Sequence, residues 1–200
     1  MNLKNSTKIP HLEPIGEIPT PTEALLEGGN ILTLVPETDP VLKQPTQKWD
    51  FSRPEEEARQ LYLDLSRTMR ENGGIGLSSN QVGLPYRVFT LESPYGFPMG
   101  LFNPVVVSTA GEEVYMEEGC LSFPELVVKV KRPTIVRVRF AEWNGDVVTK
   151  QFEGMTARCI LHEIDHLDGK TMLDKANKIH LEKAMRRRKQ HRKLIKQHQA

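Results

Sequence analysis

The sequence His-Glu-Ile-Asp-His at positions 162–166 decides the fold, because it marks a helix that must be both amphipathic and chemically active. Apolar residues recur around it at three- and four-residue steps, which predicts an amphipathic helix over residues 156–168 that stops at Gly169. Two histidines four residues apart project from the same side of a helix. His162 and His166 are therefore predicted to hold one metal ion, in an H-E-x-x-H arrangement.

Glu163 lies beside the predicted metal and supplies a base. A bound divalent metal lowers the pKa of water from about 15.7 towards about 7, and a carboxylate within reach can accept the proton. Asp165 could orient a ligand imidazole, although a surface position suits it at least as well. A chance H-E-x-x-H is expected in on the order of 1% of chains of this length. A metal-dependent hydrolase is the favoured interpretation.

A catalytic tetrahedral site needs a third protein ligand. The downstream histidines His180, His191 and His198 lie in a basic tail, not at the short spacing of a single helix-and-turn motif. Cys120, directly after a glycine, offers a thiolate, but a lone cysteine is more often a core residue. The residues alone therefore leave the third ligand open. Cys159 is interpreted as a core or pocket-wall residue.

The other predicted elements surround this helix. Ser52 and Glu55 have the spacing of a capping box, and the next residues give a helix an apolar face formed by Ala58, Leu61, Leu65 and Met69. Strand-like runs follow at residues 87–92, 101–107, 112–117, 134–142 and 146–152, the last two joined by an Asn-Gly hairpin signal. This order predicts an α+β fold of mainly antiparallel strands packed around a central H-E-x-x-H helix, with a C-terminal helix.

Charge divides the chain into an acidic body and a basic tail. Residues 175–200 contain ten of the 27 Lys and Arg residues but one of the 26 Asp and Glu residues, so residues 1–174 have a net charge of −8. A basic C-terminal helix or tail is predicted over residues 175–200. It suits a polyanionic or acidic partner, or it is simply a solvated face, and both interpretations stay open. Residues 1–30, with four prolines, are predicted to form an extended arm.

The cell compartment is predicted from composition. Two cysteines exclude a disulfide framework and favour a reducing environment. The sequence has no apolar run long enough to span a bilayer and no apolar N-terminal stretch of the signal-peptide kind. We expect a soluble, cytoplasmic protein with no membrane partner.

Two further segments complete a set of motifs that resembles the peptide deformylase family. Residues 74–81, Gly-Ile-Gly-Leu-Ser-Ser-Asn-Gln, resemble its G-x-G-hydrophobic-A-A-x-Q loop. Residues 118–122, Glu-Gly-Cys-Leu-Ser, resemble its E-G-C-hydrophobic-S segment, and residues 162–166 resemble its H-E-x-D-H helix. The three motifs stand in the family's order. The resemblance implies a deformylase-like catalytic domain, which we expect over residues 31–174.

The resemblance implies a complete metal centre. Cys120, His162 and His166 would bind one divalent ion, Fe(II) in the cell, with Zn, Ni or Co as alternatives. Glu163 would act as general base and then as general acid. The reaction would be removal of the N-formyl group from formylmethionyl peptides, with release of formate.

The resemblance also implies contacts to the substrate. Gln81 and the backbone N–H of Leu121 would stabilise the oxyanion. The backbone of Gly76 would hydrogen-bond the peptide, and Gly119 is a second expected substrate-binding residue. The ribosome is a candidate partner, because some family members dock on it through a basic C-terminal helix that residues 175–196 resemble in charge and position.

Five positions depart from the family pattern, and one of them is Leu161, which stands where a Gln usually precedes the histidine. Ser78 and Ser79 replace two alanines, and their hydroxyls need partners if they are buried. Arg158 stands where an apolar residue often lines the methionine pocket, and Val127 lacks a positive charge that many members carry. The preference for a substrate side chain is therefore left open.

Two other functions remain as alternatives. A zinc endopeptidase of the H-E-x-x-H type would not need Cys120. A structural metal module that binds the ribosome or RNA through its tail would not need Glu163.

Overall fold

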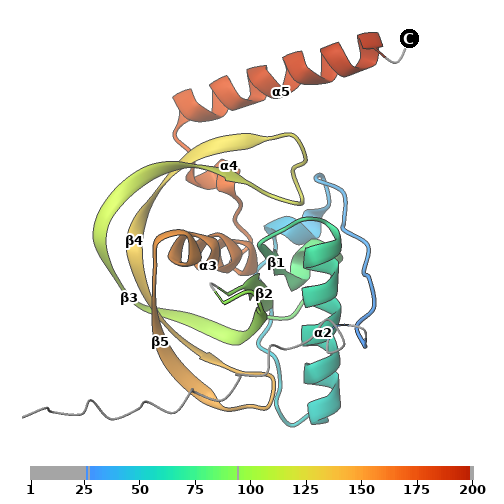
Figure 1. Cartoon of the computed structure of the whole chain (residues 1–200), viewed down its shortest axis with the longest axis vertical. Helices are drawn as coiled ribbons and strands as arrows, with labels where there is room; N and C mark the ends of the chain where they lie inside the picture. The colour runs from blue at the N-terminus through green and yellow to red at the C-terminus, as the bar shows by residue number, and fades with distance from the viewer. Residues whose placement is uncertain (1–25, 27, 94, 199–200) are drawn as a thin grey trace, which may run out of the picture.

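The computed structural model describes residue 26, residues 28–93 and residues 95–198. An α+β fold with an antiparallel sheet and C-terminal helices is confirmed (Figure 1). The extended arm expected for residues 1–30 lies almost wholly outside the described residues. In chain order, the elements are η1 (Pro40–Lys43), α2 (Glu55–Glu71), β1 (Gly76–Ser78), η2 (Ser79–Val82), β2 (Val88–Glu92), β3 (Pro98–Gly119), β4 (Val127–Ala141), β5 (Val147–Glu153), α3 (Gly154–Leu167), α4 (Met172–Lys175) and α5 (Lys178–His198).

The five strands form one antiparallel sheet in the order β1-β2-β3-β4-β5. The predicted hairpin at Asn144-Gly145 is confirmed, since Ala141 pairs with Val147 and Gly145 has φ +89°. The prediction of separate strands at 101–107 and 112–117 is wrong, because both belong to β3. Register shifts interrupt its pairing with β4, one of them between Ala110 and Glu113. Such irregularities bend a strand, and Figure 1 shows β3 and β4 curving past α3.

Two helices cover the sheet with the apolar faces that the sequence predicts. The helix expected over residues 156–168 is α3, whose buried face packs against Phe89, Leu101, Val136, Val138 and Phe140. The apolar residues of α2 join a second cluster with Leu77, Val88 and Phe102. At about 1.5–3 kcal/mol for each large side chain removed from water, the first cluster stabilises the placement of α3 and the second that of α2.

The predicted capping box at Ser52 and Glu55 is wrong. Helix α2 begins at Glu55 with Pro54 as its N-cap, and no side chain caps it. The Ser52 hydroxyl instead donates to the Asp50 carboxylate at 2.8 Å, and the Ser52 N–H donates to it at 2.9 Å. Asp50 thus accepts the N–H that a capping box would direct to the Glu55 carboxylate, and Pro54 takes the N-cap position in place of Ser52. The three glutamates of the first turn still complement the positive end of the helix.

The C-terminal region runs from α4 into the long helix α5, which lies across one end of the body (Figure 1). Its buried residue Ala184 packs with Phe123, Leu126 and Val128. Among the described helices, none has the length and apolar character needed to cross a membrane.

Candidate active site

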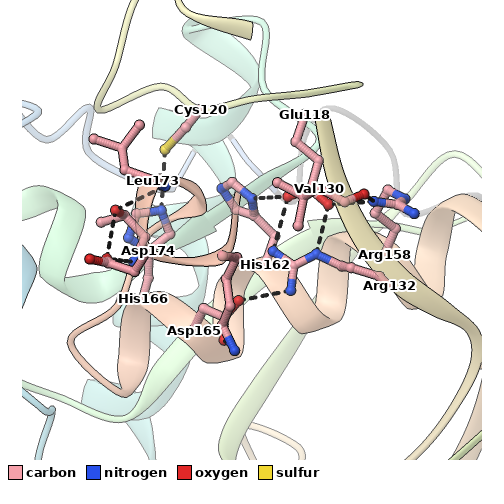
Figure 2. A network of polar contacts seen from close by, with 12 residues as sticks. Glu118, Cys120, Val130, Arg132, Arg158, His162, Asp165, His166, Leu173 and Asp174 are labelled. Atoms are coloured by element: carbon pink, nitrogen blue, oxygen red, sulfur yellow. Dashed lines mark hydrogen bonds and ion pairs between the residues drawn. The ribbon is translucent and has the colours of Figure 1, made fainter. Parts of the chain in front are cut away.

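The structure brings the three predicted metal ligands together from two distant segments. Cys120 directly follows the last residue of β3, and His162 and His166 lie on α3. Their potential ligand atoms all lie within 4.8 Å of one another, and Cys120 Sγ is 3.2 Å from His166 Nε2 (Figure 2). Atoms bonded tetrahedrally to one ion are roughly 3.3–3.8 Å apart. His180 and His191 lie elsewhere, on α5, where they contact Tyr115 and Glu125.

Glu118 orients His162, one of the predicted ligands, and the sequence alone did not indicate this contact. Its Oε2 lies 3.0 Å from His162 Nδ1, which leaves Nε2 of that ring for a metal. Arg132 binds the same carboxylate at 2.6 and 2.9 Å, and Arg158 Nη1 binds it at 2.6 Å (Figure 2). Burial raises the Glu118 pKa, but hydrogen bonds from His162 and Arg132 outweigh it and lower the pKa to about 2. The carboxylate is therefore charged. The sequence signal that could have indicated this role is the position of Glu118 two residues before Cys120.

Asp165 does not occupy either of the positions considered for it. It is buried, and its carboxylate pairs with Arg132 at 2.7 Å and Lys175 at 3.0 Å, not with a ligand imidazole. It therefore acts on the site through Arg132, which holds Glu118.

Glu163 is buried beside the ligands. Within the described part of the chain its Oε2 has no hydrogen-bond partner. Burial raises its pKa to about 7, against the opposing effects of His162 and Ser78. A carboxyl group with a pKa near neutral can both accept and return a proton. Gly76 lies against it: a Cβ at residue 76 would stand 2.5 Å from Glu163 Oε1 and 2.6 Å from Cys159 Sγ, so this close approach needs glycine.

The Gln81 side chain is held with its amide nitrogen towards Cys120. Its Oε1 accepts hydrogen bonds from the N–H and hydroxyl of Ser78, both at 2.9 Å. Its Nε2 lies 3.0 Å from Ser122 Oγ and 3.5 Å from Cys120 Sγ. The buried hydroxyls of Ser78 and Ser79 both have partners, since Ser79 donates to the Tyr86 carbonyl.

Cys120, His162, Glu163 and Gln81 line one cleft with a volume of about 450 Å³. It contains the expected substrate contacts Gly76, Gln81, Gly119 and Leu121, and Cys159 forms part of its wall, as predicted. Arg158 also lines it, but this side chain is buried and its guanidinium also donates to the carbonyls of Val114 and Val130. The full lining is Gly73–Gly76, Gln81, Glu117–Leu121, Phe123, Glu125–Val127, Met155, Arg158, Cys159, His162 and Glu163.

The donors fit a divalent transition metal. A thiolate and two imidazoles are ligands for such ions, and a nearby carboxylate often orients one ring. Burial lowers the His162 pKa, but hydrogen bonds to Cys120 and Glu118 outweigh it and raise the pKa to about 10, so negative charge converges on this ring. His166 Nδ1 and Glu163 Oε2 are buried polar atoms without a described partner. Fold and site define the class as a metal-dependent hydrolase.

Comparison with known proteins gives the family. The chain belongs to the polypeptide deformylase family, whose model matches residues 31–182. It is similar to a peptide deformylase of Desulforudis audaxviator, with 38% identity over 153 residues, 76% of this chain and 98% of the relative. It resembles the solved structure of a peptide deformylase from Synechococcus elongatus in complex with actinonin (TM-score 0.73, 36% identity, 78% of this chain and 85% of that chain). It also resembles the solved structure of peptide deformylase from Thermotoga maritima. The TM-score is 0.69 at 30% identity, and the match covers 74% of this chain and 99% of that chain.

Proposed function

We propose that this protein removes the N-formyl group from the N-terminal formylmethionine of nascent polypeptides and releases formate. The observation that carries the proposal is the convergence of Cys120, His162 and His166 within 4.8 Å, beside Glu163, in a chain of the deformylase family. We also propose that α3 is the central element of the fold, because it contacts β1, β2, β4 and β5. The comparisons do not favour a zinc endopeptidase.

Cys120, His162 and His166 are the proposed ligands of one divalent ion, Fe(II) in the cell, although the same donors accept Zn, Ni and Co. When bound, such an ion would make a water molecule nucleophilic near neutral pH. Glu163 accepts a proton from this water. As the C–N bond of the formyl amide breaks, Glu163 returns the proton to the departing nitrogen, without which an amine leaves poorly. The water oxygen stays in formate.

The chain's own donors stabilise the oxyanion that develops on the formyl group. The proposed donors are Gln81 Nε2, whose orientation is held by Ser78, and the backbone N–H of Leu121. Strand β1 is at one edge of the sheet, so the backbone of Gly76 suits pairing with an extended peptide. Gly119 lines the cleft on the side of Cys120 and is the second proposed peptide contact.

Formate release from a formyl-Met peptide, measured with anaerobically purified protein and a parallel metal assay, tests this function. Replacement of Glu163 by Gln is expected to lower turnover about 10²- to 10⁴-fold while metal content is kept. Cys120→Ser is expected to lose the metal. If that variant instead keeps its metal and cleaves internal peptide bonds, the chain is an endopeptidase. If Glu163→Gln keeps full function, the protein is a structural metal module and not a hydrolase.

We propose that residues 31–174 form the catalytic domain and that residues 175–200 are a basic helical appendage. The match of the family model to residues 31–182 and the long helix α5 support this division. Because nascent polypeptides are the proposed substrate, a cytoplasmic location is proposed as well.

We propose that the outward face of α5 docks on the ribosome. Three arginines of α5 bind the body: Arg187 pairs with Glu117, Arg188 with Glu37 and Arg192 with Glu125. Other exposed cations recur at steps of three and four residues, which places them on one face of the helix: Arg186, Lys189, Lys193 and Lys196. A row of cations suits the phosphates of RNA.

Co-sedimentation with ribosomes tests the docking face. We expect that changing its four cations to Gln weakens co-sedimentation as strongly as deletion of residues 180–200. Added salt is expected to weaken the co-sedimentation of the wild-type protein. A matched control removes four other exposed cations, Lys48, Arg59, Arg137 and Arg139. Equal sedimentation of both variants, or no loss in the deletion, contradicts the proposal.

A further inference from the structure

The charges that line the catalytic cleft divide into a buried group and an exposed group. Arg158 is the one Lys or Arg among the described lining residues, and its guanidinium is buried against Glu118. Glu163 is buried as well. The side chains of Glu117 and Glu125 are 52% and 35% exposed. These two carboxylates therefore lie at the solvent-exposed mouth of the cleft, which has no cation of its own.

Helix α5 supplies the missing positive charges. Arg192 Nε lies 2.9 Å from Glu125 Oε2, and Arg187 Nη1 lies 3.6 Å from Glu117 Oε1. His191 Nδ1 is 4.0 Å from the same Glu125 oxygen. Each carboxylate at the mouth thus faces an arginine that comes from outside the cleft lining.

The backbone of Glu125 also indicates that its position is held by its surroundings. Its φ is +64°, in the left-handed region that a residue with a side chain rarely adopts. Such a conformation persists where neighbouring structure fixes it, and it is frequent at functional sites. The pairing with Arg192 helps to fix this carboxylate at the mouth.

We propose that Arg187 and Arg192 determine which charged peptides the cleft accepts, by neutralising Glu117 and Glu125. The inference rests on the proposed function, in which the cleft binds a formylmethionyl peptide. The formyl end reacts at the buried metal ligands, so later residues of the peptide pass the exposed mouth. With both arginines present, the two carboxylates do not repel an acidic residue there. Without them, Glu125 loses its arginine partner and Glu117 keeps only the lysines near it, among them Lys129 opposite it on β4. The mouth then becomes more negative, which disfavours acidic peptides and favours basic ones.

The test uses three formyl-Met tripeptides that differ in having Asp, Ala or Lys at both later positions. The measured quantity is the ratio of kcat/KM for the Asp peptide to that for the Lys peptide. In the variant Arg187→Gln with Arg192→Gln, this ratio is expected to fall about three- to tenfold, mostly through KM. If α5 had only a structural role, kcat/KM would fall equally for all three peptides and the Asp-to-Lys ratio would stay unchanged.

The partner substitutions give the opposite sign. Glu117→Gln with Glu125→Gln is expected to raise the Asp-to-Lys ratio, and the fourfold variant is expected to return towards the wild-type value. About 1 M salt should shrink these differences, because the Debye length is then about 3 Å. Arg137→Gln with Arg139→Gln removes two exposed arginines of β4 that do not line the cleft, and serves as the charge-matched control.

Two different outcomes separate a failure of the proposed function from a failure of the charge preference. If the wild type does not release formate from the Ala peptide, the proposed function is wrong. If it does, and the Asp-to-Lys ratio stays constant in the arginine variant or changes equally in the β4 control, the charge preference does not come from α5.

Discussion

The molecule uses the same chemical pair, arginine with glutamate, in two regions that differ in burial. Beside the proposed metal ligands, Glu118 binds Arg132 and Arg158 with side chains that are 4–5% exposed. At the cleft mouth, Glu125 binds Arg192 with side chains that are 35% and 44% exposed. The distances are similar, 2.6 Å and 2.9 Å. Proximity alone therefore does not tell what a pair contributes.

Burial changes what a broken pair leaves behind. Removing one partner of a buried pair leaves an uncompensated charge out of water, which costs about 3–5 kcal/mol. An exposed pair contributes about 0.2–1 kcal/mol, because water and salt replace the lost partner. The buried region can therefore hold a ligand in one orientation. In the exposed region, a pair can be changed at little cost in stability, so it suits tuning of the charge at the cleft mouth.

Glu118→Gln is expected to have the largest effect. The variant keeps the shape of the side chain but leaves Arg132 and Arg158 without their shared carboxylate, so we expect a loss of about 3–5 kcal/mol in the free energy of unfolding. Metal affinity is expected to fall about 10- to 100-fold, because His162 Nδ1 exchanges a charged acceptor for a neutral one. Urea unfolding of the metal-free protein and chelator competition measure the two effects. Glu125→Gln is the control. Equal losses in both variants would remove the distinction between the regions.

Arg158→Met is expected to have an intermediate effect. It removes one donor from Glu118 and the donors to the Val114 and Val130 carbonyls, while Arg132 still binds Glu118. Leaving a buried polar group without its hydrogen bond lowers the free energy of unfolding by about 1–3 kcal/mol. Urea unfolding measures this loss, and Arg158→Lys, which keeps the charge but not the forked geometry, should recover only part of it. A loss as large as that of Glu118→Gln would mean that Arg132 alone does not hold the carboxylate.

The sequence predicts what depends on local periodicity. The apolar spacing of residues 156–168 predicts α3, and the four-residue step from His162 to His166 predicts that their rings lie close together, because both follow from helix geometry alone. Ser52 shows the limit of local rules. Its capping-box spacing is correct, but Asp50, two residues earlier, takes both of its donors.

Contacts between distant segments have no local pattern. Cys120 is 46 residues from His166, so its place as a third ligand came from the resemblance to a family and not from spacing. The partners of Glu118 lie 14, 40 and 44 residues away, at Arg132, Arg158 and His162. Their meeting depends on the bend of β3 and β4 past α3, which the sequence does not specify residue by residue. The network around the ligands was therefore missed.

Arg192→Gln is expected to have the smallest effect on stability. Its pair with Glu125 is exposed, so the free energy of unfolding should change by about 1 kcal/mol or less, and added salt should reduce the difference further. The loss in Glu118→Gln should persist in salt, because buried charges are screened much less. Urea unfolding of both variants at low and high salt measures this contrast. If the free energy of unfolding of Arg192→Gln instead falls by about 3 kcal/mol independently of salt, the pair holds α5 to the body as a structural element. The strained conformation of Glu125 would then serve that attachment and not the charge of the cleft.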